Sequence, residues 1–189
     1  MFGGWHGDAG WTGDPAAEER KHRFCGTYLF RYHPDEDRMV RTRELVVYGD
    51  EFDIFSNKGL DSFVCTSAGA IYGGTAIGGA IFRVDESSGA ATVIGKPVVT
   101  PRVSGMKEGP DGQVYITAGF PVMHLVRFDP RTNRFTDHGP VNPARDLCYF
   151  HGIAVCEDGT VYIGETDAAQ PIVYKLTPRT AAAPDRGAR

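Results

Sequence analysis

The sequence predicts an all-β fold in which four-stranded antiparallel units follow one another along the chain. Two patterns predict it: short apolar strand patterns alternate with turn signals throughout, and one hairpin pattern returns at a nearly constant interval. The composition agrees, because 24 glycines and 12 prolines among 189 residues favour many short strands joined by turns over long helices.

The recurring hairpin is clearest in two segments that align without a gap. Residues 104–118 read SGMKEGPDGQVYITA, and residues 151–165 read HGIAVCEDGTVYIGE. Apolar residues alternate on both sides of an Asp-Gly pair, which we expect to supply the positive φ angles of a tight turn. A third copy, DSFVCTSAGAIYGGT at 61–75, keeps the turn glycine. The turn glycines Gly69, Gly112 and Gly159 therefore recur at intervals of 43 and 47 residues.

A second strand pattern runs in phase with the hairpins and carries a cation just before a turn. The segments LFRYHPDEDR, IFRVDESSGA, LVRFDPRTNR and YKLTP contain, in this order, Arg31, Arg83, Arg127 and Lys175. The turns HPDED, DESSG and DPRTN have the residues of short hairpin loops. Each repeat thus holds strands A to D in two hairpins. We expect the four cations to make surface or inter-unit contacts, and we expect His33 and His138 to be inert.

Four antiparallel strands in a unit of about 45 residues are typical of a β-propeller blade. The inner hairpins, x-D-G-x-[VIL]-[YW]-[VIF], resemble those of the NHL, SMP-30/gluconolactonase and streptogramin B lyase-like propellers, and the resemblance covers residues 1–178. It implies an all-β propeller of four-stranded antiparallel blades. We predict a partial blade over 1–48, blades over about 49–98 and 99–142, a partial blade over 143–178 and a disordered tail over 179–189.

The predicted strands make about three and a half blades, whereas complete propellers usually have about four to eight. Three interpretations stay open. The chain is the C-terminal part of a longer propeller, or several chains complete one ring by self-association through their open sheet edges. In the third interpretation, the two incomplete blades pair in a compact four-bladed ring.

The net charge and the cysteine content indicate which binding partners and which cellular compartment to expect for this protein. A net charge of −4 predicts no binding of nucleic acid or of an anionic membrane. No apolar run is long enough to cross a bilayer, and the start MFGGWHGDAG lacks the features of a signal peptide. The four cysteines form no C-x-x-C pair, so we expect a reduced, cytoplasmic protein.

In a propeller, the D–A and B–C loops open on one face, around the mouth of the central channel. Hairpin symmetry predicts three pairs there, provided that no bulge shifts the register: Asp61 with Thr75, Ser104 with Ala118, and His151 with Glu165. A mouth with imidazoles, carboxylates, cations and aromatic rings suits a polar ligand. The residues expected to bind it are Trp5, His6, Asp8, Lys58, Asp61, Arg102, Ser104, Tyr149 and Asp167.

His151 and Glu165 are the candidate catalytic pair. An imidazole and a carboxylate can share a divalent ion, or the carboxylate can orient the ring as a general base. The resemblance to streptogramin lyases implies His151 as the base and Glu165 as a metal ligand. That family needs a second His/Glu set on another blade, which the aligned pairs of this chain do not supply. A purely structural role for both residues is the alternative.

The lactonase-like propellers imply a different metal, a calcium ion held by carboxylates and an asparagine at the channel. Glu165, Asp61 and Asn57 are the candidates here, so Mg or Ca is the expected cofactor. We therefore expect a propeller that binds a polar small molecule or carbohydrate at its mouth, as a metal-assisted lyase or a lactonase-like hydrolase. The alternative is a non-catalytic scaffold or sensor that binds a protein or a carbohydrate.

Overall fold

The structure is a computed structural model that describes residues 2–5, 27–45, 60–76, 78–88, 90–166 and 171–177. The described residues form 14 strands and one short 3-10 helix, η1 (Pro34–Glu36), and the strands make four antiparallel sheets. The predicted all-β class and the sheet composition of propeller blades are thus confirmed. We number these sheets blades 1 to 4 in chain order.

Each blade follows the chain from strand to neighbouring strand. Blade 1 contains β1 (Phe2–Trp5), β2 (Thr27–His33) and β3 (Arg38–Leu45). Blade 2 contains β4 (Leu60–Cys65), β5 (Ile71–Thr75), β6 (Ile81–Val84) and β7 (Ala91–Gly95). Blade 3 contains β8 (Val103–Glu108), β9 (Val114–Ala118), β10 (His124–Asp129) and β11 (Arg134–Pro140). Blade 4 contains β12 (Phe150–Val155), β13 (Val161–Glu165) and β14 (Val173–Leu176).

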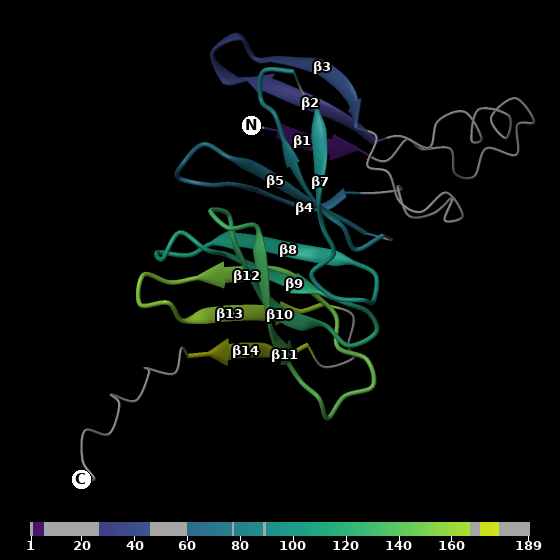
Figure 1. The fold of residues 1–189 in the computed structure, drawn as a ribbon, viewed down its shortest axis with the longest axis vertical. Coiled ribbons are helices and arrows are strands. Elements are labelled where there is room, and N and C mark those ends of the chain that lie inside the picture. Colours follow the sequence, from purple (N-terminus) through teal and green to yellow (C-terminus); the bar gives the residue numbers. More distant parts are fainter. Residues whose placement is uncertain are drawn as a thin grey trace, which may run out of the picture.

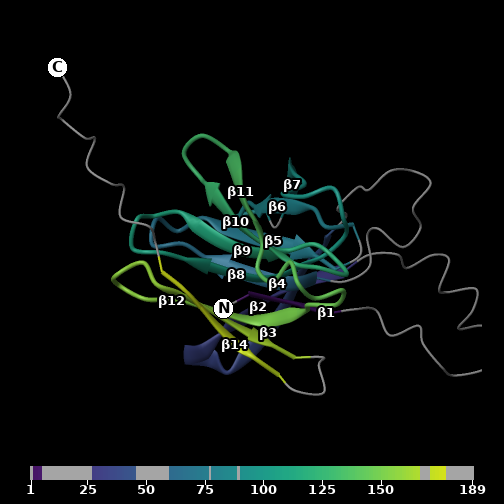
Figure 2. The ribbon, with the colours of Figure 1, turned by 90° about the horizontal axis from the view of Figure 1, so that it is seen from below.

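The first strands of successive blades pack against one another. Strand β8 contacts both β4 and β12, and β1 contacts β4. Blade 1 and blade 2 follow one another along the long axis of the molecule, and blades 3 and 4 come after them at the same height in this view (Figure 1). The outer strands β11 and β14 point apart when the molecule is seen from below (Figure 2). Inner strands in contact with diverging outer strands are the arrangement expected of propeller blades.

The A–B turns differ in one detail from the expectation. In blade 4, the Cys156 N–H donates to the Thr160 carbonyl, and the Gly159 N–H donates to the Cys156 carbonyl, both at 2.9 Å. Gly159 has a φ of 80°, whereas Asp158 is not among the residues with positive φ. The loop therefore has three residues and ends on a left-handed glycine, so Gly159 alone, and not the Asp-Gly pair, supplies the positive φ.

The aspartate of the turn closes the loop through its side chain instead. The Asp158 carboxylate accepts hydrogen bonds from the Thr160 N–H at 2.9 Å and from Thr160 Oγ1 at 3.0 Å. The backbone hydrogen bond is the larger cause of a lowered pKa for Asp158. The two residues of the Asp-Gly pair thus have different roles: the aspartate side chain accepts a backbone hydrogen bond, and the glycine adopts the left-handed conformation.

Glycines allow the blades to approach closely. A Cβ on Gly74 of blade 2 would lie 2.3 Å from Cγ1 of Val103 in blade 3. A Cβ on Gly105 of blade 3 would lie 3.0 Å from Cγ2 of Ile153 in blade 4. One core cluster joins blades 2 and 3, with Tyr72 and Phe128 among its members, and another joins blades 3 and 4. The hydrophobic core therefore lies between blades, and this packing sets the positions of the strand ends at the mouth.

Candidate functional site

The first strand of blades 2, 3 and 4 bulges at the same place near the mouth. In blade 4 the predicted register holds from Val155 with Val161 to Gly152 with Gly164. Glu165 then pairs with Phe150, and the register shifts at His151. The predicted pairing of His151 with Glu165 was therefore wrong, because a bulge adds one residue to one strand only.

The other two predicted pairs fail for the same reason. In blade 2 the register shifts at Asp61, so Thr75 pairs with Leu60. In blade 3 it shifts at Ser104, and Ala118 pairs with Val103. The bulge is thus a property of the repeat, and it places one extra residue per blade beside the mouth.

A row of contacting side chains crosses the mouth from blade 2 to blade 4. Nε of Arg102 lies 2.8 Å from Oδ2 of Asp61 in an ion pair. The guanidinium carbon of Arg102 lies 4.4 Å from the centroid of the Tyr149 ring. The rings of Tyr149 and His151 meet edge to face, with centroids 4.6 Å apart and planes at 85°. We call Asp61, Arg102, Tyr149 and His151 the mouth row; all four are predicted site residues.

The side chains of the mouth row differ in exposure, and His151 is the most accessible of the four. The Asp61 side chain is 13% exposed and that of Arg102 is 32% exposed. Tyr149 is buried, and its ring also meets Phe120 edge to face at 6.2 Å, whereas His151 is exposed. A cation over a ring contributes more when it is partly shielded from water, so Arg102 is held firmly against Tyr149. The row therefore presents a fixed guanidinium beside an accessible imidazole.

Arg102 has an unusual backbone conformation. Its φ is 86°, a left-handed value that costs a non-glycine residue about 1–2 kcal/mol. The Gly119 N–H donates to the Arg102 carbonyl at 2.8 Å and holds this conformation in place. On the other side, Gly79 leaves room, because a Cβ there would lie 2.9 Å from the Arg102 nitrogen. Strained residues that the surrounding structure holds in place cluster at functional sites.

Glu165 belongs to a separate cluster. Its side chain is 2% exposed, and Nη1 of Arg145 donates to both of its carboxylate oxygens at 2.6 Å. The Tyr174 hydroxyl donates to Oε2 of Glu165 at 3.4 Å and accepts a hydrogen bond from Asn142 at 3.1 Å. The carboxylate is thus engaged by Arg145 and does not orient the His151 ring in this arrangement.

The sequence reasoning missed Arg145 and Tyr174. Arg145 lies in the loop before β12, and its position as a cation in a D–A loop was the one signal that could have identified it. The side-chain hydrogen bond with Tyr174 is the largest cause of a raised pKa for Arg145. Burial is the main cause of a raised pKa for the neighbouring thiol of Cys148.

The remaining predicted residues do not join the mouth row. Ser104 is buried, with its hydroxyl 3.1 Å from that of Thr117, and it donates to the Met123 sulfur at 3.5 Å. It is therefore part of the core. The backbone of Trp5 belongs to β1, but its side chain is not described. Outside the described residues lie His6, Asp8, Asn57, Lys58 and Asp167.

The described residues do not fit a divalent cation as they stand. Among them, no group of three His, Cys, Asp or Glu side chains could hold a metal ion. The predicted ligands Glu165 and Asp61 are each paired with a guanidinium. The expectation of Mg or Ca stays a prediction, since five of the residues considered for the mouth lie outside the described ranges.

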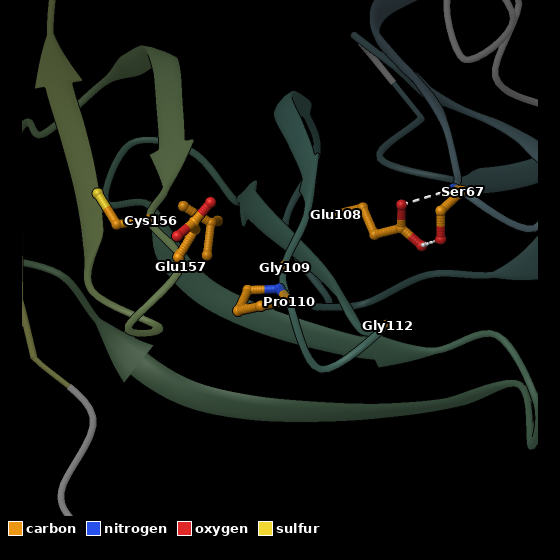
Figure 3. A pocket seen from close by; sticks show the side chains of 8 residues that line it. Ser67, Glu108, Gly109, Pro110, Gly112, Cys156 and Glu157 are labelled. Carbon is orange, nitrogen blue, oxygen red and sulfur yellow. Dashed lines mark hydrogen bonds between the residues drawn. The ribbon is translucent and has the colours of Figure 1, made fainter.

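The opposite end of the blades carries a pocket formed by three A–B turns. The pocket has a volume of about 380 Å³ and is lined from blade 2 by Ser67, from blade 3 by residues such as Glu108 and Gly112, and from blade 4 by Cys156 and Glu157 (Figure 3). The Glu108 carboxylate accepts hydrogen bonds from the Ser67 N–H at 2.6 Å and from Ser67 Oγ at 3.0 Å. Turns distant in sequence thus line one pocket, as expected of neighbouring propeller blades.

Fold and mouth geometry together define a set of β-propeller blades with a polar row across the mouth. The solved structures with a similar fold include virginiamycin B lyase from Staphylococcus aureus, with a TM-score of 0.56 and 14% identity over 82% of this chain. A protein assigned as a gluconolactonase matches with a TM-score of 0.54 and 14% identity over 83% of this chain. The propeller domain of Cps50 (Swd1) from Myceliophteria thermophila matches with a TM-score of 0.57 and 11% identity over 79%.

The likeness at these identities concerns the fold alone, and the expected β-propeller fold is confirmed. This chain spans 50%, 54% and 49% of the lengths of those three structures. It spans 20% of a matching extracellular domain from B. thetaiotaomicron. No family model and no curated protein matches the chain. Among the described residues, no helix is long and apolar enough to cross a membrane.

Proposed function

We propose that this protein binds a polar small molecule at the mouth of the propeller, against Arg102 and His151. The observation that carries the proposal is the mouth row. It joins three blades through one ion pair and two ring contacts, and it ends in an exposed imidazole. Sites of this kind combine an aromatic wall with a few fixed polar groups.

The chemistry of the row favours a hydroxylated ligand with an anionic group. Asp61 lies next to Nε of Arg102, so the terminal nitrogens of the guanidinium can donate to a carboxylate of the ligand. The imidazole of His151 can donate to or accept from a hydroxyl group. Sugar acids are the simplest molecules that carry both groups.

Lyase or hydrolase chemistry at the same mouth is the second candidate. The virginiamycin B lyase and the protein assigned as a gluconolactonase share the fold, and His151 is the exposed imidazole that could serve as a general base. A role for a divalent metal would require ligands beyond Glu165 and Asp61, because each of these is paired with an arginine. A scaffold that binds a protein through the same face is the remaining alternative.

Nuclear magnetic resonance on the purified protein tests the binding proposal. Sodium gluconate, galacturonate and glucose are titrated while the imidazole signals of all histidines are followed. We expect at least one acid to shift the His151 signals saturably, and we expect Arg102→Gln to weaken that binding about tenfold, the effect of losing one charge-assisted hydrogen bond.

Two controls sharpen the test. Arg131→Gln removes an exposed arginine of blade 3 that pairs with an acid, Asp129, and it should leave the titration unchanged. Metal analysis of the same samples examines the lyase or hydrolase candidate, which predicts a stoichiometric divalent ion. The binding proposal fails if none of the compounds shifts the His151 signals, or if the shifts are the same in Arg102→Gln.

A further inference from the structure

A second hollow lies away from the mouth, between the outer strands of blades 3 and 4. It has a volume of about 630 Å³, within the range of small-molecule sites. We call it the inter-blade groove. Tyr115, Leu125 and Val141 line it from blade 3 and the segment that follows, and Val161 and Leu176 line it from blade 4. The outer strands on its two sides diverge (Figure 2).

The equivalent space between blades 2 and 3 is filled by aromatic rings. Tyr72 of blade 2 packs edge to face on Phe128 of blade 3 at 5.2 Å, and Phe135 lies 5.0 Å behind Phe128. Strand register makes Leu176 the blade 4 equivalent of Phe128, because Phe128 pairs with Val114 as Leu176 pairs with Val161. A leucine therefore stands where the other interface has a phenylalanine ring, and this accounts for the hollow.

Two basic residues line the groove. Arg127 and His138 line it, and no Asp or Glu is among its lining residues. No ion pair joins Arg127 to an acid among the residues that the structure describes. Tyr115 lies between Arg127 and the nearby Asp111: its hydroxyl donates to the Asp111 carboxylate at 3.1 Å, and its side chain is also hydrogen-bonded with Arg127.

The equivalent cations of the other blades are placed differently. Arg31 of blade 1 donates to the backbone carbonyl of Glu86 in blade 2, and its terminal nitrogen lies 3.8 Å from the Glu86 carboxylate. Arg83 lines a hollow that also contains Asp85 and Glu86. Of these three arginines, only Arg127 lines a hollow with no Asp or Glu among its lining residues. The three arginines therefore have different surroundings, although they hold equivalent positions in the repeat.

We propose that the inter-blade groove is a second binding site, which takes a small organic anion with an apolar body, such as an aromatic or alkyl carboxylate. The apolar part lies between Leu125, Val161 and Leu176, where it occupies the space of the missing ring. The acid group lies against Arg127 and His138. An apolar floor with one cationic end matches such a molecule in both shape and charge.

Fluorescence titration with anilinonaphthalene sulfonate tests this site, because the dye combines fused rings with one anionic group. We expect saturable binding of one dye per chain and displacement by decanoate. Arg127→Gln should weaken binding about tenfold or more, as expected for the loss of one charge-assisted contact. Leu176→Phe should weaken it at least as much by filling the groove. The uncharged analogue phenylnaphthylamine should bind wild type and Arg127→Gln equally.

Arg83→Gln is the matched control, because Arg83 pairs with Tyr72 across the strands as Arg127 pairs with Tyr115. It should leave dye binding unchanged. The proposal is overturned if the dye does not bind, if Arg127→Gln binds like wild type, or if Arg83→Gln has the same effect as Arg127→Gln. A thermal unfolding curve for each variant shows whether it is folded. If Leu176→Phe does not fold, the comparison of dye binding between wild type and Arg127→Gln is sufficient to test the proposal.

Discussion

At the scale of single residues, two carboxylates that were expected to bind a ligand or a metal at the mouth each form an ion pair with an arginine instead. Glu165 is nearly inaccessible, and Arg145 occupies both of its oxygens. Asp61 pairs with Arg102, which in turn lies over Tyr149. A carboxylate engaged in this way anchors its neighbours, so both residues are positioned to hold loops at the mouth.

Replacement of Glu165 by Gln should therefore destabilise the protein. The change leaves Arg145 without its counter-charge, which costs roughly 3–5 kcal/mol for a fully buried pair. Because the Arg145 side chain is 32% exposed, we expect a smaller loss of about 2 kcal/mol in the free energy of unfolding, measured by urea denaturation. The exposed Glu157, replaced by Gln, should change the free energy by less than about 0.5 kcal/mol. Equal effects would contradict this account of the pair.

The left-handed backbone of Arg102 gives a second prediction. Arg102→Ala and Arg102→Gly both remove the ion pair with Asp61, but only glycine relieves the positive φ of 86°. Arg102→Gly should therefore be more stable than Arg102→Ala by about 1 kcal/mol in thermal or urea unfolding. The order would be reversed if the backbone of residue 102 were unstrained, because glycine also gives the unfolded chain more freedom.

At the scale of strands and hairpins, the repeat was predictable and its irregularities were not. Alternating apolar residues and turn glycines locate the strands within a few residues, because burial of one face enforces a period of two. The bulges at Asp61, Ser104 and His151 escaped prediction. A bulge adds a residue without changing the composition of the strand, so hairpin symmetry alone pairs the wrong residues.

The turn glycines should be irreplaceable for reasons of backbone conformation alone. Gly69 has a φ of 80°, and a Cβ there would meet no atom within 4 Å. Gly69→Ala should therefore cost about 1 kcal/mol through the left-handed conformation, without a steric clash. Gly164 also has open space around a Cβ, but its φ is not in the positive range, so Gly164→Ala should be neutral or slightly stabilising. Chemical denaturation of the two variants separates these expectations.

At the scale of the whole molecule, the core lies between blades, so contacts distant in sequence determine stability. The sequence predicted the propeller because each repeat has one apolar pattern, but it could not reveal which glycines face a neighbouring blade. It also could not predict that Leu176 leaves a groove between blades 3 and 4, at the place where Phe128 fills the space between blades 2 and 3. The glycine contacts and the groove both depend on how closely one blade packs against the next.

Addition of one methyl group at such a contact should destabilise the packing of two blades. A Cβ on Gly74 would lie 2.3 Å from the Val103 side chain, so Gly74→Ala forces the blades apart. We expect a loss of about 1–3 kcal/mol in the free energy of unfolding. Gly152→Ala is the control, since no atom lies within 4 Å of its Cβ position. If both variants unfold at the same urea concentration, blades 2 and 3 do not pack as described.

The mouth row takes Asp61 from blade 2, Arg102 from the start of blade 3, and Tyr149 and His151 from blade 4. Propeller genes grow and shrink by duplication or loss of whole repeats. An extra unit inserted between these blades would separate each side chain from its partner, whereas a unit added outside them would leave all the contacts intact. The contacts of the mouth row are therefore compatible with added repeats only outside blades 2 to 4.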